Sequence, residues 1–184
     1  MDKGKLYFIT GGARSGKSTF AEKLAASFQK KVLYIATCEP CDEEMVKRVK
    51  LHRERRPLSW ETIEEPYDVE TVISTYGNRY GTILIDCLTL FVTNHLLKTN
   101  PIDDYSSEDD REKEVLQHVE NMAKWLLAVD AHGIIVSNEV GMGLVPDNPL
   151  GRFYRDVLGK ANQIAASMAH EVYFMVSGIP LRIK

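Results

Sequence analysis

The chain has 184 residues and a mass of 20.8 kDa, which fits a single domain over residues 1–184 with a core of its own. Hydrophobic residues make up 44% and charged residues 27%, and the formal net charge of −3 argues against a general nucleic-acid binder. No apolar run approaches the roughly 20 residues of a membrane-spanning helix. The apolar run near the N-terminus is too short for a signal peptide, so we expect a cytoplasmic protein.

Five short apolar runs predict β-strands, at 5–10, 32–36, 82–86, 133–137 and 172–177. Each run is almost continuously apolar rather than alternating, as expected of strands that are covered on both faces. Helical patterns lie between the runs, such as Phe20, Leu24 and Phe28 after the first and a stripe at about 150–169. The alternation indicates an α/β fold, in which helices flank a mostly parallel sheet. The final LRIK could add an antiparallel edge strand.

The sequence GGARSGKS at 11–18 directly follows the first predicted strand and matches the phosphate-binding pattern G-x-x-x-x-G-K-[ST]. Glycines let the backbone turn its N–H groups toward a phosphate, and the helix that begins here adds its N-terminal dipole. Lys17 can reach the β- and γ-phosphates of a nucleotide, and the Ser18 hydroxyl can bind Mg²⁺. We therefore predict a P-loop NTPase-like (RecA-like) fold. Its triphosphate site would be built by Gly11, Gly12, Ala13, Arg14, Ser15, Gly16, Lys17 and Ser18.

A P-loop also requires an acidic side chain at the end of a neighbouring strand, where it holds magnesium directly or through water. Asp86 ends the third predicted strand, TILID, and is the candidate for this role. The same carboxylate could instead cap the turn that follows, because aspartate is common at strand ends.

A basic segment at 42–56, DEEMVKRVKLHRERR, predicts a helix that ends before Pro57. His52 lies on or beside its inward face, with Arg48 and Arg55 about one turn before and after it. The pattern leaves two interpretations open. Either the segment is a solvated basic face, or its cations surround a polyphosphate and His52 is a nucleophile. A neutral imidazole could attack the α-phosphorus of a nucleotide, forming a phosphoramidate and releasing pyrophosphate.

Two of the three cysteines, Cys38 and Cys41, form a C-x-x-C. A structural zinc site requires a second pair of ligands, and the sequence supplies none at suitable spacing. We interpret the pair as small residues in a loop after the second strand, with redox or metal chemistry as the alternative.

Several segments along the chain together resemble one known family. They are TGGARSGKS (10–18), YIAT (34–37), the basic segment with Pro57 (42–57), W-x-T-x-E (60–64), VTN (92–94) and SNEVGMGLVPDNPLGRFYRDVLGKANQ (137–163). This set is similar to the bifunctional adenosylcobinamide kinases/adenosylcobinamide-phosphate guanylyltransferases of cobalamin biosynthesis. The resemblance covers essentially the whole chain, and its most specific parts are the histidine helix and the loop NEVGMGLVP.

The resemblance implies two successive reactions. ATP or GTP would phosphorylate the aminopropanol hydroxyl of adenosylcobinamide. GTP would then guanylylate a histidine, and the GMP would pass to adenosylcobinamide phosphate to give adenosylcobinamide-GDP. The catalytic residues would be Lys17 and His52, because Leu51-His52 stands where some relatives carry two histidines. A homotrimer is also implied.

The resemblance further implies a set of GTP-contacting residues. Besides the P-loop, the set comprises Thr37, Cys38, Glu39, Arg53, Glu54, Arg55, Arg56, Glu64 and Asp86, with Ser18 and Asp86 holding Mg²⁺. Glu64 is chosen over its neighbour Glu65. Asn138 and Glu139 could contact substrate, or they could cap helices.

Two other classes of protein compete with this prediction. One is a P-loop kinase of small molecules that never forms a covalent nucleotidyl intermediate. The other is a nucleotide-dependent switch or motor, against which the lack of an N-K-x-D guanine motif speaks. Uptake of GMP by His52 would distinguish the family prediction from the kinase alternative, which forms no such adduct.

Overall fold

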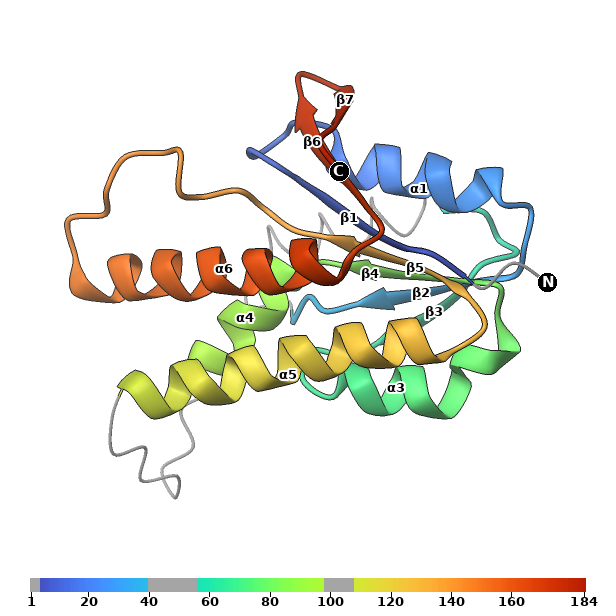
Figure 1. Ribbon diagram of the computed structural model, residues 1–184, viewed down its shortest axis with the longest axis horizontal. Helices are drawn as coiled ribbons and strands as arrows, with labels where there is room; N and C mark the ends of the chain where they lie inside the picture. Colours follow the sequence, from blue (N-terminus) through green and yellow to red (C-terminus); the bar gives the residue numbers. More distant parts are fainter. Residues whose placement is uncertain (1–3, 40–55, 98–107) are drawn as a thin grey trace.

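The computed structural model describes residues 4–39, 56–97 and 108–184, and every structural statement refers to these ranges. Their elements form one sheet with helices on both faces (Figure 1). In chain order they are β1 (Leu6–Gly11), α1 (Lys17–Ser27), β2 (Val32–Ala36), β3 (Glu61–Glu64), α3 (Val69–Tyr76), the 3-10 helix η1 (Gly77–Arg79), β4 (Thr82–Asp86), α4 (Leu88–Leu97), α5 (Glu108–Ala128), β5 (His132–Val136), α6 (Pro149–Met168), β6 (Glu171–Val176) and β7 (Ile179–Arg182).

The strand order of the sheet is β3-β2-β4-β5-β1-β6-β7. All neighbouring pairs are parallel except β6 and β7, which form an antiparallel hairpin at one edge. The parallel strands therefore end at the same edge of the sheet, and the loops that follow β1, β2, β4 and β5 meet there. The expected α/β architecture is confirmed, including the antiparallel last strand.

Strand β3 is absent from the sequence-based prediction, although the other strands of the parallel set are confirmed with small shifts at their ends. Its sequence, ETIE, is short, and its residues are exposed or half-buried rather than continuously apolar. It becomes a strand because it pairs with β2 at the free edge of the sheet. The helix predicted at 42–56 lies outside the described residues.

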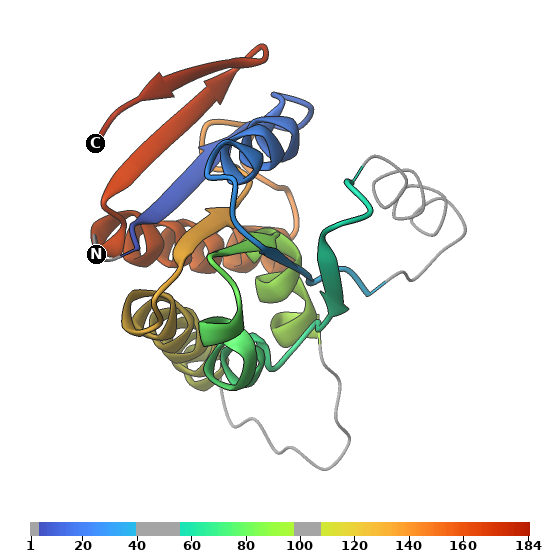
Figure 2. The ribbon, with the colours of Figure 1, turned by 90° about the vertical axis from the view of Figure 1, so that its right-hand side faces the viewer.

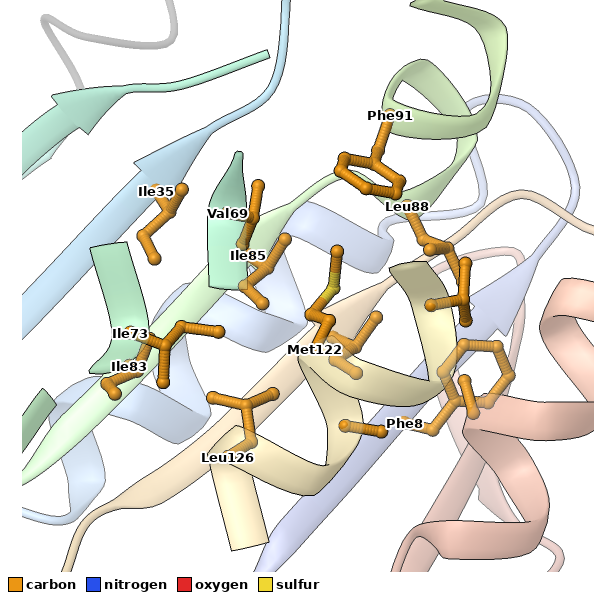
Figure 3. Packing of buried hydrophobic residues seen from close by; sticks show 14 of the residues in the cluster. Phe8, Ile35, Val69, Ile73, Ile83, Ile85, Leu88, Phe91, Met122 and Leu126 are labelled. Carbon is orange, nitrogen blue, oxygen red and sulfur yellow. The ribbon is translucent and has the colours of Figure 1, made fainter. Parts of the chain in front are cut away.

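The core has two layers, because successive side chains of a strand point to opposite faces of the sheet. From β1, Leu6 and Phe8 join the larger layer beneath α3, α4, α5 and α6, whereas Tyr7 and Ile9 face α1. Figure 2 shows that α1, among the helices of the described residues, lies on one side of the sheet and the others on the opposite side. Figure 3 shows part of the larger layer, where Phe8 lies among side chains that include Met122 and Leu126.

Helix α1 lies on the sheet through small residues. Ala21 and Ala25 are fully buried, while the predicted stripe of Phe20, Leu24 and Phe28 is only half-buried. The helix and its apolar side are therefore as predicted. The residues that contact the sheet most closely are the two alanines rather than the larger side chains. Small side chains let the helix axis approach the strands closely, and the larger ones flank the contact. In the described parts of the chain, no helix is both long and apolar enough to cross a membrane.

Helix α6 offers a matched test of this packing. Leu158 is fully buried against the larger layer, whereas Leu150 on the first turn is 52% exposed. We expect Leu158→Ala to lower the free energy of unfolding by about 2–5 kcal/mol, because the truncation leaves a cavity. Leu150→Ala should change it by about 0.5 kcal/mol or less. Urea unfolding followed by circular dichroism measures both, and equal losses would contradict the assigned faces of α6.

Candidate nucleotide-binding site

The loop between β1 and α1 has the backbone conformation that its glycines predict. Gly11 and Gly16 have φ angles of 148° and 93°, in the region that favours glycine, and Arg14 at the loop tip has a φ of 56°. The amide of Ser15 donates to the Gly12 carbonyl over 3.2 Å, so the loop folds back on itself before the helix begins. The result is a tight turn that opens directly onto the N-terminus of α1.

Two neighbouring segments brace this loop. The amide of Gly178, in the turn between β6 and β7, donates to the Ser15 carbonyl over 2.9 Å. On the other side, the amide of Glu139 donates to the Gly11 carbonyl over 3.0 Å. A methyl group at Gly16 would lie 3.1 Å from the Gly178 Cα, which leaves almost no room for a side chain. The loop therefore depends on contacts from both sides.

Lys17 is buried at the start of α1, and its ammonium donates to the Gly12 carbonyl over 2.6 Å. The cation thus lies against the backbone of its own loop, where a bound triphosphate would meet it. The predicted pairing of the P-loop with Asp86 stays a prediction.

Asp86 closes β4 at this edge, and its Oδ2 accepts a hydrogen bond from the Tyr34 hydroxyl over 2.8 Å. Within residues 4–39, 56–97 and 108–184, no donor reaches the other carboxylate oxygen, Oδ1. A hydroxyl and a carboxylate oxygen are the ligand types that Mg²⁺ prefers. Ser18, in the first turn of α1, and Asp86 fit the predicted magnesium site in their chemistry. They remain a prediction, since no group of three His, Cys, Asp or Glu side chains in the described chain is arranged to hold a metal.

Arg56 lies over the ring of Tyr34, with its guanidinium carbon 3.5 Å from the ring centroid. Its Nη1 is also 3.5 Å from the Thr62 hydroxyl on β3. Burial and the negative charge of Asp86 raise the pKa of Tyr34 well above its ordinary value. The phenol therefore remains a hydrogen-bond donor at neutral pH. Neither Tyr34 nor this stacking was predicted from the sequence.

Thr37 follows β2 and is fully buried. Its hydroxyl donates to the Cys87 carbonyl over 2.7 Å and accepts from the Cys87 amide over 2.8 Å. Asn94, from the VTN segment, donates to the Thr37 carbonyl over 2.8 Å and to the Pro66 carbonyl over 3.1 Å. The structure thus places Thr37 where it fixes the backbone next to Asp86, and Asn94 ties this edge together. The predicted contact of Thr37 with GTP stays a prediction.

The paired strands distinguish the two adjacent glutamates. Ala36 pairs with Glu64 on β3 and with Asp86 on β4, so these three residues stand in one row on one face. Glu65 instead accepts the amides of Tyr67 and Asp68, each over 2.9 Å, and stabilises the turn before α3. The predicted contact of Glu64 with GTP stays a prediction.

Other predicted residues are placed as follows. Glu39 is exposed and accepts a hydrogen bond from the Tyr67 hydroxyl over 2.6 Å, and Cys38 is a half-buried cysteine. Ala13 is exposed at the loop tip, next to Gly12. His52 and its neighbours lie outside the described residues, as does Cys41, so their predicted roles are neither confirmed nor contradicted. They are His52, Arg53, Glu54 and Arg55.

The loop after β5 forms a wall next to the P-loop. The Glu139 carboxylate accepts the amides of Gly141 and Met142, over 2.8 and 3.0 Å, and so shapes this loop. The residue that caps α6 is Asn148, whose side chain accepts the Gly151 amide over 2.6 Å. A hollow of about 480 Å³ lies between this loop, the P-loop and the end of β6. Its lining residues are Gly12, Ala13, Ser15, Glu139, Met142, Gly143, Phe174, Met175, Val176 and Ser177.

A glycine loop between β1 and α1, a lysine on that helix and an aspartate at the end of β4 define a P-loop nucleotide-binding protein. Comparison with known proteins is consistent with this class and narrows it. The family model for cobinamide kinase / cobinamide phosphate guanyltransferase, CobU, matches residues 7–183. The chain therefore belongs to this family.

Curated relatives match over almost their whole length. The bifunctional adenosylcobalamin biosynthesis protein CobU of Escherichia coli (strain K12) is 37% identical over 187 residues, which cover 97% of this chain and 99% of the relative. CobU of Salmonella typhimurium is 38% identical over 181 residues, with the same coverage. The bifunctional adenosylcobalamin biosynthesis protein CobP of Pseudomonas aeruginosa is 40% identical over 176 residues, covering 96% of this chain and 95% of the relative.

The backbone of the P-loop gives one test of the site. Gly16→Ala would place a side chain at a positive φ and against Gly178, so we expect it to destabilise the fold by about 1–2 kcal/mol and to weaken GTP binding. Gly12→Ala is the matched control for stability, because a methyl group there meets no neighbouring atom in the described chain. Thermal unfolding and GTP titration measure these effects. Equal stability of the two variants would contradict the observed loop conformation.

The Cys87 thiol gives a second test. Burial chiefly, with the charge of Asp86, raises the pKa of Cys87 to about 12. Because the thiolate is the reactive form, we expect less than about 0.1% of it at pH 8.5 and almost no alkylation by iodoacetamide in the native protein. Peptide mass mapping locates the modified cysteines, and the protein in guanidinium should show full modification. Rapid alkylation of Cys87 in the native protein would contradict its raised pKa.

Proposed function

We propose that this protein phosphorylates adenosylcobinamide and then transfers GMP from GTP to adenosylcobinamide phosphate, giving adenosylcobinamide-GDP. The observation that carries the proposal is the braced P-loop with Lys17 at its opening, in a chain that belongs to the cobinamide kinase / cobinamide phosphate guanyltransferase family. The names of the CobU and CobP relatives supply the substrate class. We further propose that the enzyme acts in the cytoplasm as a homotrimer.

In the kinase step, the P-loop amides and Lys17 hold the triphosphate of ATP or GTP. The hydroxyl of the corrinoid's aminopropanol arm attacks the γ-phosphorus, and the nucleoside diphosphate leaves. Ser18 and Asp86 would hold Mg²⁺, which would neutralise charge on the phosphate oxygens. Lys17 stabilises the same charge from the protein side, which is the main contribution that a protein makes to phosphoryl transfer.

In the nucleotidyl step, a nitrogen of the neutral His52 imidazole attacks the α-phosphorus of GTP and displaces pyrophosphate. The phosphate of adenosylcobinamide phosphate then attacks the same phosphorus, releasing the histidine. Arg53, Arg55 and Arg56 would stabilise the charge that develops on the phosphoryl oxygens. The position of Arg56 supports a cationic side chain near the phosphates. Its guanidinium lies over the ring of Tyr34, and the hydroxyl of Tyr34 is bound to Asp86.

The nucleotidyl step is tested by labelling. Incubation with GTP labelled with ³²P at the α-position should leave an acid-labile, alkali-stable label on the protein, because a phosphoramidate has this stability. His52→Ala should abolish the label, whereas His170→Gln, at the opposite edge of the sheet, should keep it. Label kept by His52→Ala would refute the assignment of His52 as the nucleophile, and no label on the wild-type protein would favour the small-molecule kinase without a covalent intermediate.

The kinase step is tested at the P-loop. Lys17→Ala should reduce phosphorylation of adenosylcobinamide by at least about a hundredfold, because the cation next to the transferred phosphate is lost. Lys23→Ala is the matched control, since it removes an exposed cation from the same helix α1. Transfer of phosphate from γ-labelled ATP and GTP to the corrinoid measures the step and its nucleotide preference. Unchanged activity of Lys17→Ala would refute the P-loop assignment.

A further inference from the structure

Tyr34 reaches Asp86 because of the register between β2 and β4. Ala36 pairs with Asp86, and Tyr34 lies two positions earlier on β2, so both side chains point to the face covered by α1. The long phenol runs along the sheet from its pairing position next to Leu84 and ends 2.8 Å from Oδ2 of Asp86. Tyr34 is only 1% exposed. Its reach to the carboxylate is therefore fixed by two paired strands rather than by a loop.

The other side of the Tyr34 ring is also occupied. Arg56 stacks on it, and Thr62, which pairs with Tyr34 across β2 and β3, lies next to the guanidinium. A cation above a buried ring is attracted by the negative face of the ring. The ring cannot tilt away from Asp86 without disturbing this contact, so Tyr34 is held on both sides.

Core packing alone does not explain the hydroxyl. A buried phenylalanine would fill the same space, and a buried tyrosine must find a partner for its hydroxyl or lose stability. The partner here is the aspartate assigned to magnesium, of which one oxygen is bound by Tyr34 and the other has no donor among the described residues. A carboxylate held through one oxygen cannot rotate freely, so its second oxygen keeps one direction.

We propose that Tyr34 is a positioning residue for the metal-bound nucleotide: its hydroxyl holds Oδ2 of Asp86 and thereby presents Oδ1 to Mg²⁺, while Arg56 holds the ring in place. This inference rests on the proposed function, in which Asp86 serves Mg²⁺ at the P-loop. It adds a residue that lies behind the metal ligand, contacts neither nucleotide nor metal, and acts only through the orientation of Asp86.

The test is the magnesium dependence of GTP binding by Tyr34→Phe, which keeps the ring but removes the hydroxyl. GTP affinity is titrated calorimetrically in EDTA and at increasing Mg²⁺, so the readout is binding rather than turnover. We expect unchanged affinity in EDTA and about a ten- to hundredfold higher Mg²⁺ concentration for half-maximal enhancement, the usual cost of removing a partner of a metal ligand. The EDTA arm also reports whether the P-loop of the variant is folded.

Tyr173→Phe is the matched control. Its hydroxyl likewise donates to a carboxylate, Oε2 of Glu171, over 2.9 Å, but this pair lies at the opposite edge of the sheet, where β6 begins. This variant should bind GTP as the wild-type protein does at every Mg²⁺ concentration. An equal shift in the two tyrosine variants would overturn the proposal, because it would indicate a general effect on the fold.

A double-mutant cycle with Asp86→Asn tests whether Tyr34 acts through Asp86. If it does, Tyr34→Phe causes no further loss of magnesium dependence once Asp86 is replaced. Additive losses, or wild-type magnesium dependence in Tyr34→Phe alone, overturn the role of Tyr34. If the wild-type protein binds GTP equally well with and without Mg²⁺, the failure lies instead with the proposed magnesium site.

Discussion

The site depends on the central position of β1. This strand is paired on one side with β5 and on the other with β6, so the loop that leaves it emerges between two further loops. Each of these loops donates one amide to a P-loop carbonyl, from Glu139 to Gly11 and from Gly178 to Ser15. The glycine turn is thus stabilised by loops that the strand order places on both sides of it. Because α1 begins directly after this turn, the turn also fixes the positions of Lys17 and of the N-terminus of α1.

The sequence was most informative where chemistry requires particular residues at fixed spacing. The glycines at 11 and 16 predicted the turn of the loop, and the position of Asp86 at a strand end was predicted from the apolar run before it. Tyr34 could not be predicted, since in VLYIA it looks like any other core residue and its role depends on the register between β2 and β4. The same holds for Asn94, which joins Thr37 to Pro66 across segments distant in the chain. Strand β3 lacks an apolar signal because only one of its edges is paired.

The basic segment before Pro57 had two interpretations, a solvated face or a set of cations for a polyphosphate. The part of it that the structure describes, Arg56, is half-buried and stacked on Tyr34 next to the P-loop edge. The Arg56 side chain therefore does not belong to a fully solvated basic face. Its guanidinium lies over the Tyr34 ring, and Nη1 also contacts the Thr62 hydroxyl on β3.

The hydrogen bond between Gly178 and Ser15 also has a consequence for the order of folding. It joins residues that are far apart in the chain, so during synthesis the P-loop cannot be fully braced until the turn between β6 and β7 has been made. At about 5–20 residues per second, the loop waits on the order of ten to thirty seconds for its last contact. For most of that interval β1 also lacks β5, and it lacks β6 until nearly the end. The nucleotide site is therefore among the first segments of the described chain to be synthesised and among the last to be completed.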